Sequence, residues 1–85
     1  MSNASIDIIL KLIEDAKPSE GFKTPSAEDD LWALNYVDSF AIVKLISLME
    51  DRLGIVFDFA DLNVGHFRTA NAIQNLLVTK YGLKS

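Results

Sequence analysis

The chain has 85 residues, of which 49% are hydrophobic, and its formal net charge at pH 7 is −4. This length fits one small domain that buries roughly 60% of its unfolded surface, and the acidic balance argues against nucleic-acid or anionic-membrane binding. The absence of cysteine excludes disulfides and thiolate metal sites, and it suits a reducing cytoplasm. No apolar run is long enough to span a bilayer, so we expect no membrane insertion.

The N-terminal residues resemble an expression-tag remnant, carried by Ser2, Asn3 and Ala4. Residues 1–4 are therefore set aside from functional reasoning, and residues 5–85 are interpreted as a single domain. Asp7 and Lys11 interrupt the only hydrophobic segment nearby, which does not have the layout of a secretory signal. We expect a cytoplasmic protein.

The first helix is predicted from about Ser5 to Lys17. Ser5 is a suitable N-cap, Asp7 is a favourable anion in the first turn, and Pro18 stops the helix. The expected buried stripe has helical spacing and consists of Ile6, Ile9, Leu10 and Ile13.

A long loop is predicted over residues 19–30, which include Gly21, Pro25 and scattered charges. Loops of this length are uncommon in small domains and are often functional or mobile. We expect Phe22 and Trp32 to anchor the loop to the core, with a short helical turn over residues 28–34.

The central helix is predicted from Ser39 to about Leu53, and Gly54 is a good left-handed residue to end it. Residues 55–57 are too short to define a strand and are expected to form an extended connection. The apolar positions of the helix are spaced so that they share one face: Ile42, Leu45, Ile46, Met49 and Leu53.

A brief third helix is predicted over residues 58–63, capped by Asp58 and broken after its end by Gly65. Phe59 and Leu62 are expected to face inwards. Asp58 and Asp61 are three residues apart, and the simplest interpretation of the pair is a cap and a solvated face.

The last helix is predicted from Ala70 to about Tyr81, with Thr69 as its cap and Gly82 at its end. The predicted fold class is all-α, a bundle of three main helices and one short helix with a long first loop. The core face of the last helix is expected to comprise Ile73, Leu76, Leu77 and Tyr81.

No self-sufficient catalytic constellation is visible. His66 is the single histidine, and nothing beside it in sequence pairs with a nucleophile such as Ser39. The charge run over residues 28–30 lacks the alternating ligands, central glycine and terminal glutamate of a calcium loop. The chain is therefore expected to be acted upon by enzymes rather than to be one.

Ser39 lies where the central helix should begin, between Asp38 and Phe40. Its hydroxyl can cap the helix, which is the simpler interpretation of Asp-Ser before an amphipathic helix. It can also present a site for a covalently attached phosphate, which the positive end of the helix dipole would stabilise. The motif alone leaves both interpretations open.

The wider pattern resembles the acyl carrier proteins over nearly the whole chain. Its parts are Asp38-Ser39-Phe40, an amphipathic helix ending in residues 50–55 (EDRLGI), a short acidic turn and a capped last helix. Residues 67–73 (FRTANAI) make the chain most similar to stand-alone D-alanyl carrier proteins. The resemblance implies an acyl-carrier-like bundle.

The resemblance also implies a function. Ser39 would carry 4′-phosphopantetheine, donated from coenzyme A by a separate phosphopantetheinyl transferase, and Asp38 would help engage that enzyme and its metal. The arm would hold an acyl or aminoacyl group as a thioester. A monomeric carrier would then shuttle this group between an adenylate-forming ligase and a downstream acyltransferase or synthase.

Some residues depart from the better-known carriers. Tyr36 stands where many have glycine, and Ala41, Lys44 and Ser47 occupy outward positions where fatty-acid carriers have acids. We therefore expect a dedicated ligase to load the chain better than fatty-acid synthase enzymes do. The predicted partner-binding face, whose aromatic and valine side chains should form a partly exposed apolar platform, comprises Phe40, Ala41, Val43, Lys44 and Phe67.

Two other classes of function remain. In the first, Ser39 is only a helix N-cap and the chain is a small helical protein–protein interaction module. In the second, the chain is a small enzyme, which one histidine and no cysteine make a poor fit.

Overall fold

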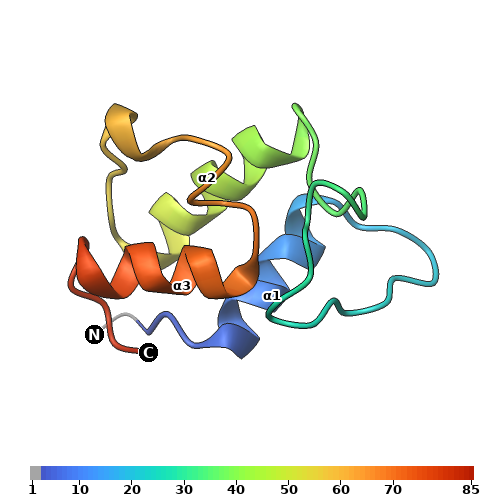
Figure 1. Ribbon diagram of the computed structural model, residues 1–85, viewed down its shortest axis with the longest axis horizontal. Coiled ribbons are helices and arrows are strands. Elements are labelled where there is room, and N and C mark those ends of the chain that lie inside the picture. The colour runs from blue at the N-terminus through green and yellow to red at the C-terminus, as the bar shows by residue number, and fades with distance from the viewer. Residues whose placement is uncertain (1–2) are drawn as a thin grey trace.

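The computed structural model describes residues 3–85, and within that range the chain forms three α-helices and no strand. The helices are α1 (Ile6–Ala16), α2 (Ala41–Leu53) and α3 (Ala70–Thr79), with a short 3₁₀ helix, η1 (Phe59–Asp61), between α2 and α3 (Figure 1). The all-α prediction is confirmed, and residues 55–57 are an extended connection as expected. None of the helices in this range combines the length and apolar character that crossing a membrane requires.

Local side chains begin the helices as the sequence predicts. The Ile8 N–H donates to Ser5 Oγ at 3.3 Å, and the Ala72 N–H donates to Thr69 Oγ1 at 3.0 Å. Each hydroxyl satisfies a backbone donor that has no partner inside its helix. At the other end of α2, Gly54 adopts a left-handed conformation with φ of 67°.

The buried face of α1 is wider than predicted. Ile9 and Ile13 are buried as expected, but Leu12 is buried too, whereas Ile6 and Leu10 lie half-buried at the edge of the core. The reason is that α1 contacts both α2 and α3. A helix with two neighbours needs apolar side chains over a broader arc than one stripe.

The buried face of α2 is rotated relative to the prediction. Its members are Ala41, Leu45, Met49 and Leu53, while Ile42 and Ile46 are half-buried. The expectation that Ala41 faces outwards is therefore wrong, since only 5% of its surface is exposed. Ala41 borders the same groove as Ala16 at the end of α1.

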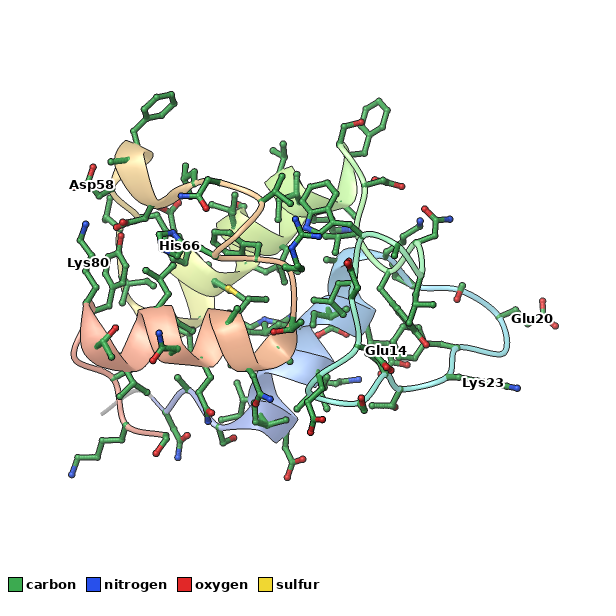
Figure 2. The ribbon with its side chains drawn as sticks, viewed as in Figure 1. Glu14, Glu20, Lys23, Asp58, His66 and Lys80 are labelled. Atoms are coloured by element: carbon green, nitrogen blue, oxygen red, sulfur yellow. The ribbon has the colours of Figure 1, made fainter. Side chains whose placement is uncertain are left out.

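The first loop is tied to the segment before α3. Asp30 Oδ1 accepts the Trp32 and Ala33 N–H groups, each at 3.0 Å, and Asp30 Oδ2 pairs with Arg68 at 3.1 Å. Trp32 is half-buried against the core, which confirms it as an anchor, whereas Phe22 packs edge-to-face on Tyr36. Figure 2 shows Glu20 and Lys23 at the outer edge of this loop, pointing away from the helices.

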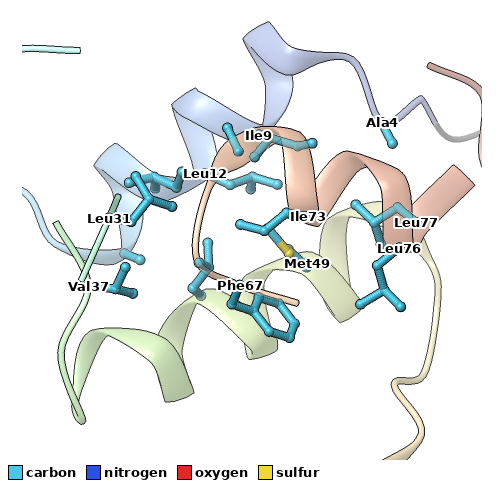
Figure 3. Close-up of a cluster of buried hydrophobic side chains, with 14 of the residues drawn as sticks. Ala4, Ile9, Leu12, Leu31, Val37, Met49, Phe67, Ile73, Leu76 and Leu77 are labelled. Carbon is cyan, nitrogen blue, oxygen red and sulfur yellow. The ribbon is translucent and has the colours of Figure 1, made fainter. Parts of the chain in front are cut away.

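The core lies between the three helices and includes side chains from the loops. Phe67 is 1% exposed, so the expectation that it is partly exposed is wrong. Its ring packs edge-to-face on that of Phe57, with 5.6 Å between the ring centroids. The centroids of the Phe57 and Tyr81 rings are 5.2 Å apart, which confirms Tyr81 as part of the core face. Figure 3 shows the fully buried members, among them Ile9, Leu12, Leu31, Met49, Phe67, Ile73 and Leu77.

The segment around η1 differs from its prediction. Asp58 caps it, since the Ala60 N–H donates to Asp58 Oδ1 at 3.2 Å, but Phe59 is 88% exposed and Leu62 is 36% exposed. Both were expected to face inwards. The inward-facing side chain is that of Asp61, because Lys80 and Tyr81 at the end of α3 bind its carboxylate.

The two ends of the described chain lie side by side (Figure 1). The Ala4 N–H donates to the Lys84 carbonyl at 2.6 Å, and Ala4 is fully buried. Met1 and Ser2, two of the four residues set aside as a tag remnant, lie outside the described residues.

Two phenylalanines on either side of residues 62–64 provide a matched test of this core. Phe67→Ala should lower the free energy of unfolding by about 3–5 kcal/mol, because it empties a closely packed site. Phe59→Ala, which removes an exposed ring, should change it by less than about 0.5 kcal/mol. Urea unfolding followed by circular dichroism measures both, and equal effects would contradict the burial described here.

Candidate functional site

The carboxylate of Asp38, not the hydroxyl of Ser39, caps α2. Asp38 Oδ1 accepts the Phe40 N–H at 3.0 Å and the Ala41 N–H at 2.8 Å. The helix begins at Ala41, two residues later than predicted, so Ser39 lies in the turn that precedes it. Ser39 is exposed, and within residues 3–85 its hydroxyl forms no hydrogen bond.

The second oxygen of Asp38 is bound by Lys17, the residue that follows α1. Lys17 Nζ lies 3.0 Å from Asp38 Oδ2 and donates to the Asn35 carbonyl at 2.8 Å. The pKa of Asp38 is held below its ordinary value, first by the hydrogen bond from the Ala41 N–H and then by Lys17. Both oxygens of the carboxylate that precedes Ser39 thus contact the protein's own donors, although the side chain remains 42% exposed.

An open groove of about 780 Å³ borders Ser39. Phe40 and Val43 contribute apolar surface to it, with 88% and 66% of their surfaces exposed, which confirms the expected exposure of both. Lys17 and Lys44 place two cations along the same groove, and the first of them is paired with Asp38, which also borders it. The site therefore combines a free hydroxyl, an apolar wall and one cation, Lys44, beyond the Lys17–Asp38 pair.

The structure brings together only part of the predicted partner-binding face. Phe40, Val43 and Lys44 are exposed and line the groove beside Ser39. Ala41 borders the same groove but is only 5% exposed, and Phe67 lies in the core, bordering a separate groove of about 210 Å³ between α2 and residues 62–64. Including Ala41 and Phe67 in the exposed face was wrong.

A second polar cluster joins η1 to the end of α3. Asp61 is only 6% exposed, and its Oδ2 lies 2.8 Å from Lys80 Nζ and accepts the Tyr81 hydroxyl at 2.7 Å. Lys80 and then Tyr81 hold the pKa of Asp61 below its ordinary value. The interpretation of Asp61 as part of a solvated face was wrong. Figure 2 shows Asp58, His66 and Lys80 at this end of the molecule.

His66 belongs to the same end of the structure. Its Nδ1 lies 2.9 Å from the Asp61 carbonyl and 3.1 Å from Asn63 Nδ2. These contacts fold residues 61–66 into a closed turn. In the described part of the chain, no group of three or more histidine, cysteine, aspartate or glutamate side chains is placed to hold a metal ion.

Sequence reasoning missed Lys17 and Lys80, which complete the two polar clusters. Both reach partners 19 to 21 residues away in the chain, so local spacing carries no signal for either pairing. A composition that is one quarter charged also offers many alternative ion pairs. Only the packing of the helices selects these two.

Comparison with known proteins found no family model and no curated protein that matches this chain.

Three variants at two neighbouring residues separate capping from exposure at this turn. Asp38→Ala should lower Tm by about 4–8 °C, because two backbone donors at the start of α2 lose their acceptor. Ser39→Ala should leave Tm nearly unchanged, and Asp38→Asn, which retains a capping oxygen, should fall between them. Calorimetry measures all three; a larger loss for Ser39→Ala than for Asp38→Ala would contradict the assignment of the cap.

The Asp61 cluster predicts a specific loss of stability in acid. Its folded-state pKa lies below the unfolded value of about 3.9, so its stabilisation is complete above that pH and is lost as the pH falls through the lower folded-state pKa. Asp61→Asn should therefore destabilise the protein at neutral pH and flatten the acidic limb of the stability curve. Urea unfolding across the acidic range measures this, with Asp51→Asn as an exposed control. Parallel curves for Asp61→Asn and the unchanged protein would contradict the prediction.

Proposed function

We propose that this chain is an acyl or aminoacyl carrier, and that Ser39 is the attachment point for 4′-phosphopantetheine. The observation that carries the proposal is the capping of α2 by Asp38, which leaves the Ser39 hydroxyl exposed and without a hydrogen-bond partner in residues 3–85. A serine engaged as the cap would have to give up that bond before reacting. Here the hydroxyl is available in the folded state.

The surroundings of Ser39 suit a covalently attached phosphodiester. Ser39 lies in the turn before α2, a helix of 13 residues whose N-terminus carries partial positive charge. An anion at that position is stabilised by the helix dipole, and Lys44 adds positive charge along the groove, where Lys17 is paired with Asp38. No histidine lies beside Ser39 in the sequence, so the proposal assigns the activation of its hydroxyl to a separate transferase.

We expect the remainder of the arm to lie along this open groove. Phe40 and Val43 support this expectation, because they offer apolar surface directly after Ser39. When bound, the arm supplies a thiol, which this cysteine-free chain lacks, for holding an acyl or aminoacyl group as a thioester. Tethering would raise the effective concentration of that group at a partner's active site.

The proposed partner-binding face consists of Phe40, Val43 and Lys44. These exposed side chains belong to the start of α2 and border the same groove as Ser39. An adenylate-forming ligase and a downstream acyltransferase or synthase would approach from this side. Lys44 would repel a basic enzyme patch that expects carboxylates, so the face favours a dedicated ligase over fatty-acid synthase enzymes.

The finer fold assignment, an acyl-carrier-like bundle most similar to stand-alone D-alanyl carriers, belongs to the same proposal. It is supported by the element order of α1, a long loop, α2, η1 and α3. The second candidate is a protein–protein interaction module, which the exposed Phe40 and Val43 would also serve. Covalent modification separates the two.

The decisive experiment is intact-mass spectrometry after incubation with coenzyme A, magnesium and a broad-specificity transferase. The unchanged chain should gain one phosphopantetheine group, and Ser39→Ala should gain none. Ser47→Ala provides the matched control, because Ser47 is the other serine that borders the groove, and its modification should be complete. An unmodified parent chain would favour the interaction module, and addition to Ser39→Ala would place the arm elsewhere.

A further inference from the structure

Lys17 connects three segments that meet at the turn before Ser39. Its backbone N–H donates to the Ile13 carbonyl at the end of α1, its Nζ donates to the Asn35 carbonyl at 2.8 Å, and the same Nζ pairs with Asp38 at 3.0 Å. Lys17 also borders two grooves, one beside Ser39 and one beneath the first loop.

The contact with Asn35 lies in a turn of the connection between α1 and α2. Asn35 is the one non-glycine residue in the described chain with positive φ, at 63°. Asparagine tolerates this left-handed conformation better than most residues, but the turn still needs support from its surroundings. Lys17 holds the carbonyl of Asn35 and the side chain of Asp38, and therefore both ends of the four-residue stretch that leads to Ser39.

The ion pair is poorly suited to a purely stabilising role. The side chains of Lys17 and Asp38 are 33% and 42% exposed, and pairs of this kind add little to stability because water screens them. Geometry is more sensitive than stability: a displacement of about 1 Å at a reacting group can lower a rate by about 100-fold. An interaction with a small effect on stability can thus have a large effect on a reaction at Ser39.

We propose that Lys17 is a positioning residue for the modification of Ser39, acting through Asp38 and the Asn35 carbonyl. This inference rests on the proposed carrier function. Lys17 holds the Asp38 carboxylate in the orientation that caps α2, and the cap in turn fixes the turn on which the Ser39 hydroxyl is presented to the transferase. Its substitution therefore alters the rate of modification more than the stability of the fold.

The kinetic test compares the rate of phosphopantetheine transfer among three variants. Lys17→Met should lower kcat/KM by about 5- to 10-fold while leaving the circular dichroism spectrum unchanged, and Lys17→Arg, which retains a donor and the charge, should recover most of the rate. Lys23→Met removes the same charge from the exposed first loop and controls for electrostatic steering. Its rate should stay within about twofold of the parent. A Lys17→Met rate equal to the parent rate would overturn the proposal.

A double-mutant cycle tests the route through Asp38. In an Asp38→Asn background the ion pair is already lost and only the hydrogen bond from Lys17 to the Asn35 carbonyl remains, so adding Lys17→Met should lower kcat/KM by a smaller factor than it does in the parent background. Full additivity of the two effects would overturn the proposed route, since it would mean that Lys17 acts independently of Asp38.

Amide hydrogen exchange in the unmodified protein distinguishes this inference from the proposed function. Lys17→Met should accelerate exchange of the Phe40 and Ala41 N–H groups, which Asp38 accepts, and leave the α3 amides unchanged. Unchanged exchange of the Phe40 and Ala41 N–H groups would overturn the positioning role of Lys17 while leaving Ser39 as the modification site. The converse result is that Lys17→Met accelerates this exchange although no transferase modifies the parent protein. That result would support the effect of Lys17 on the cap and refute the carrier function.

Discussion

The carboxylate of Asp38 is the interaction on which the candidate site depends. One of its oxygens accepts two backbone N–H groups at the start of α2, and the other pairs with Lys17 after α1. The same side chain thus ends the first loop, begins the central helix and links it to the preceding one. These donors hold the pKa of Asp38 below its ordinary value, because they favour the ionised form of the carboxylate that caps the helix. Ser39 owes its free hydroxyl to this arrangement.

Local chemistry made much of the fold predictable from the sequence. Ser5, Asp58 and Thr69 each cap the element that follows them, and Gly54 ends α2, because these effects involve residues only a few positions apart. The choice between Asp38 and Ser39 as the cap was not predictable. Both residue types cap well, and the backbone path of the turn, which depends on contacts with α1, decides between them.

Burial was harder to predict because it depends on neighbours distant in sequence. Phe59 and Phe67 have the same side chain, yet one is 88% exposed and the other 1%. The ring of Phe67 packs against the ring of Phe57. The backbone carbonyl of Phe67 accepts the Trp32 indole N–H at 3.2 Å, a contact across 35 residues. Ala41 illustrates the same limit, since it was expected to face outwards but is only 5% exposed.

The central claim is that the free hydroxyl in the turn before α2 is the point of attachment, and a ¹H–³¹P correlation spectrum tests it most directly. After treatment with coenzyme A and a transferase, the account predicts one phosphodiester resonance coupled to the β-protons of Ser39. The chemical shifts of the Phe40 and Ala41 amides should remain those of capped residues, since Asp38 keeps its role. A phosphorus resonance coupled to a different serine or threonine, or none at all, would contradict the account.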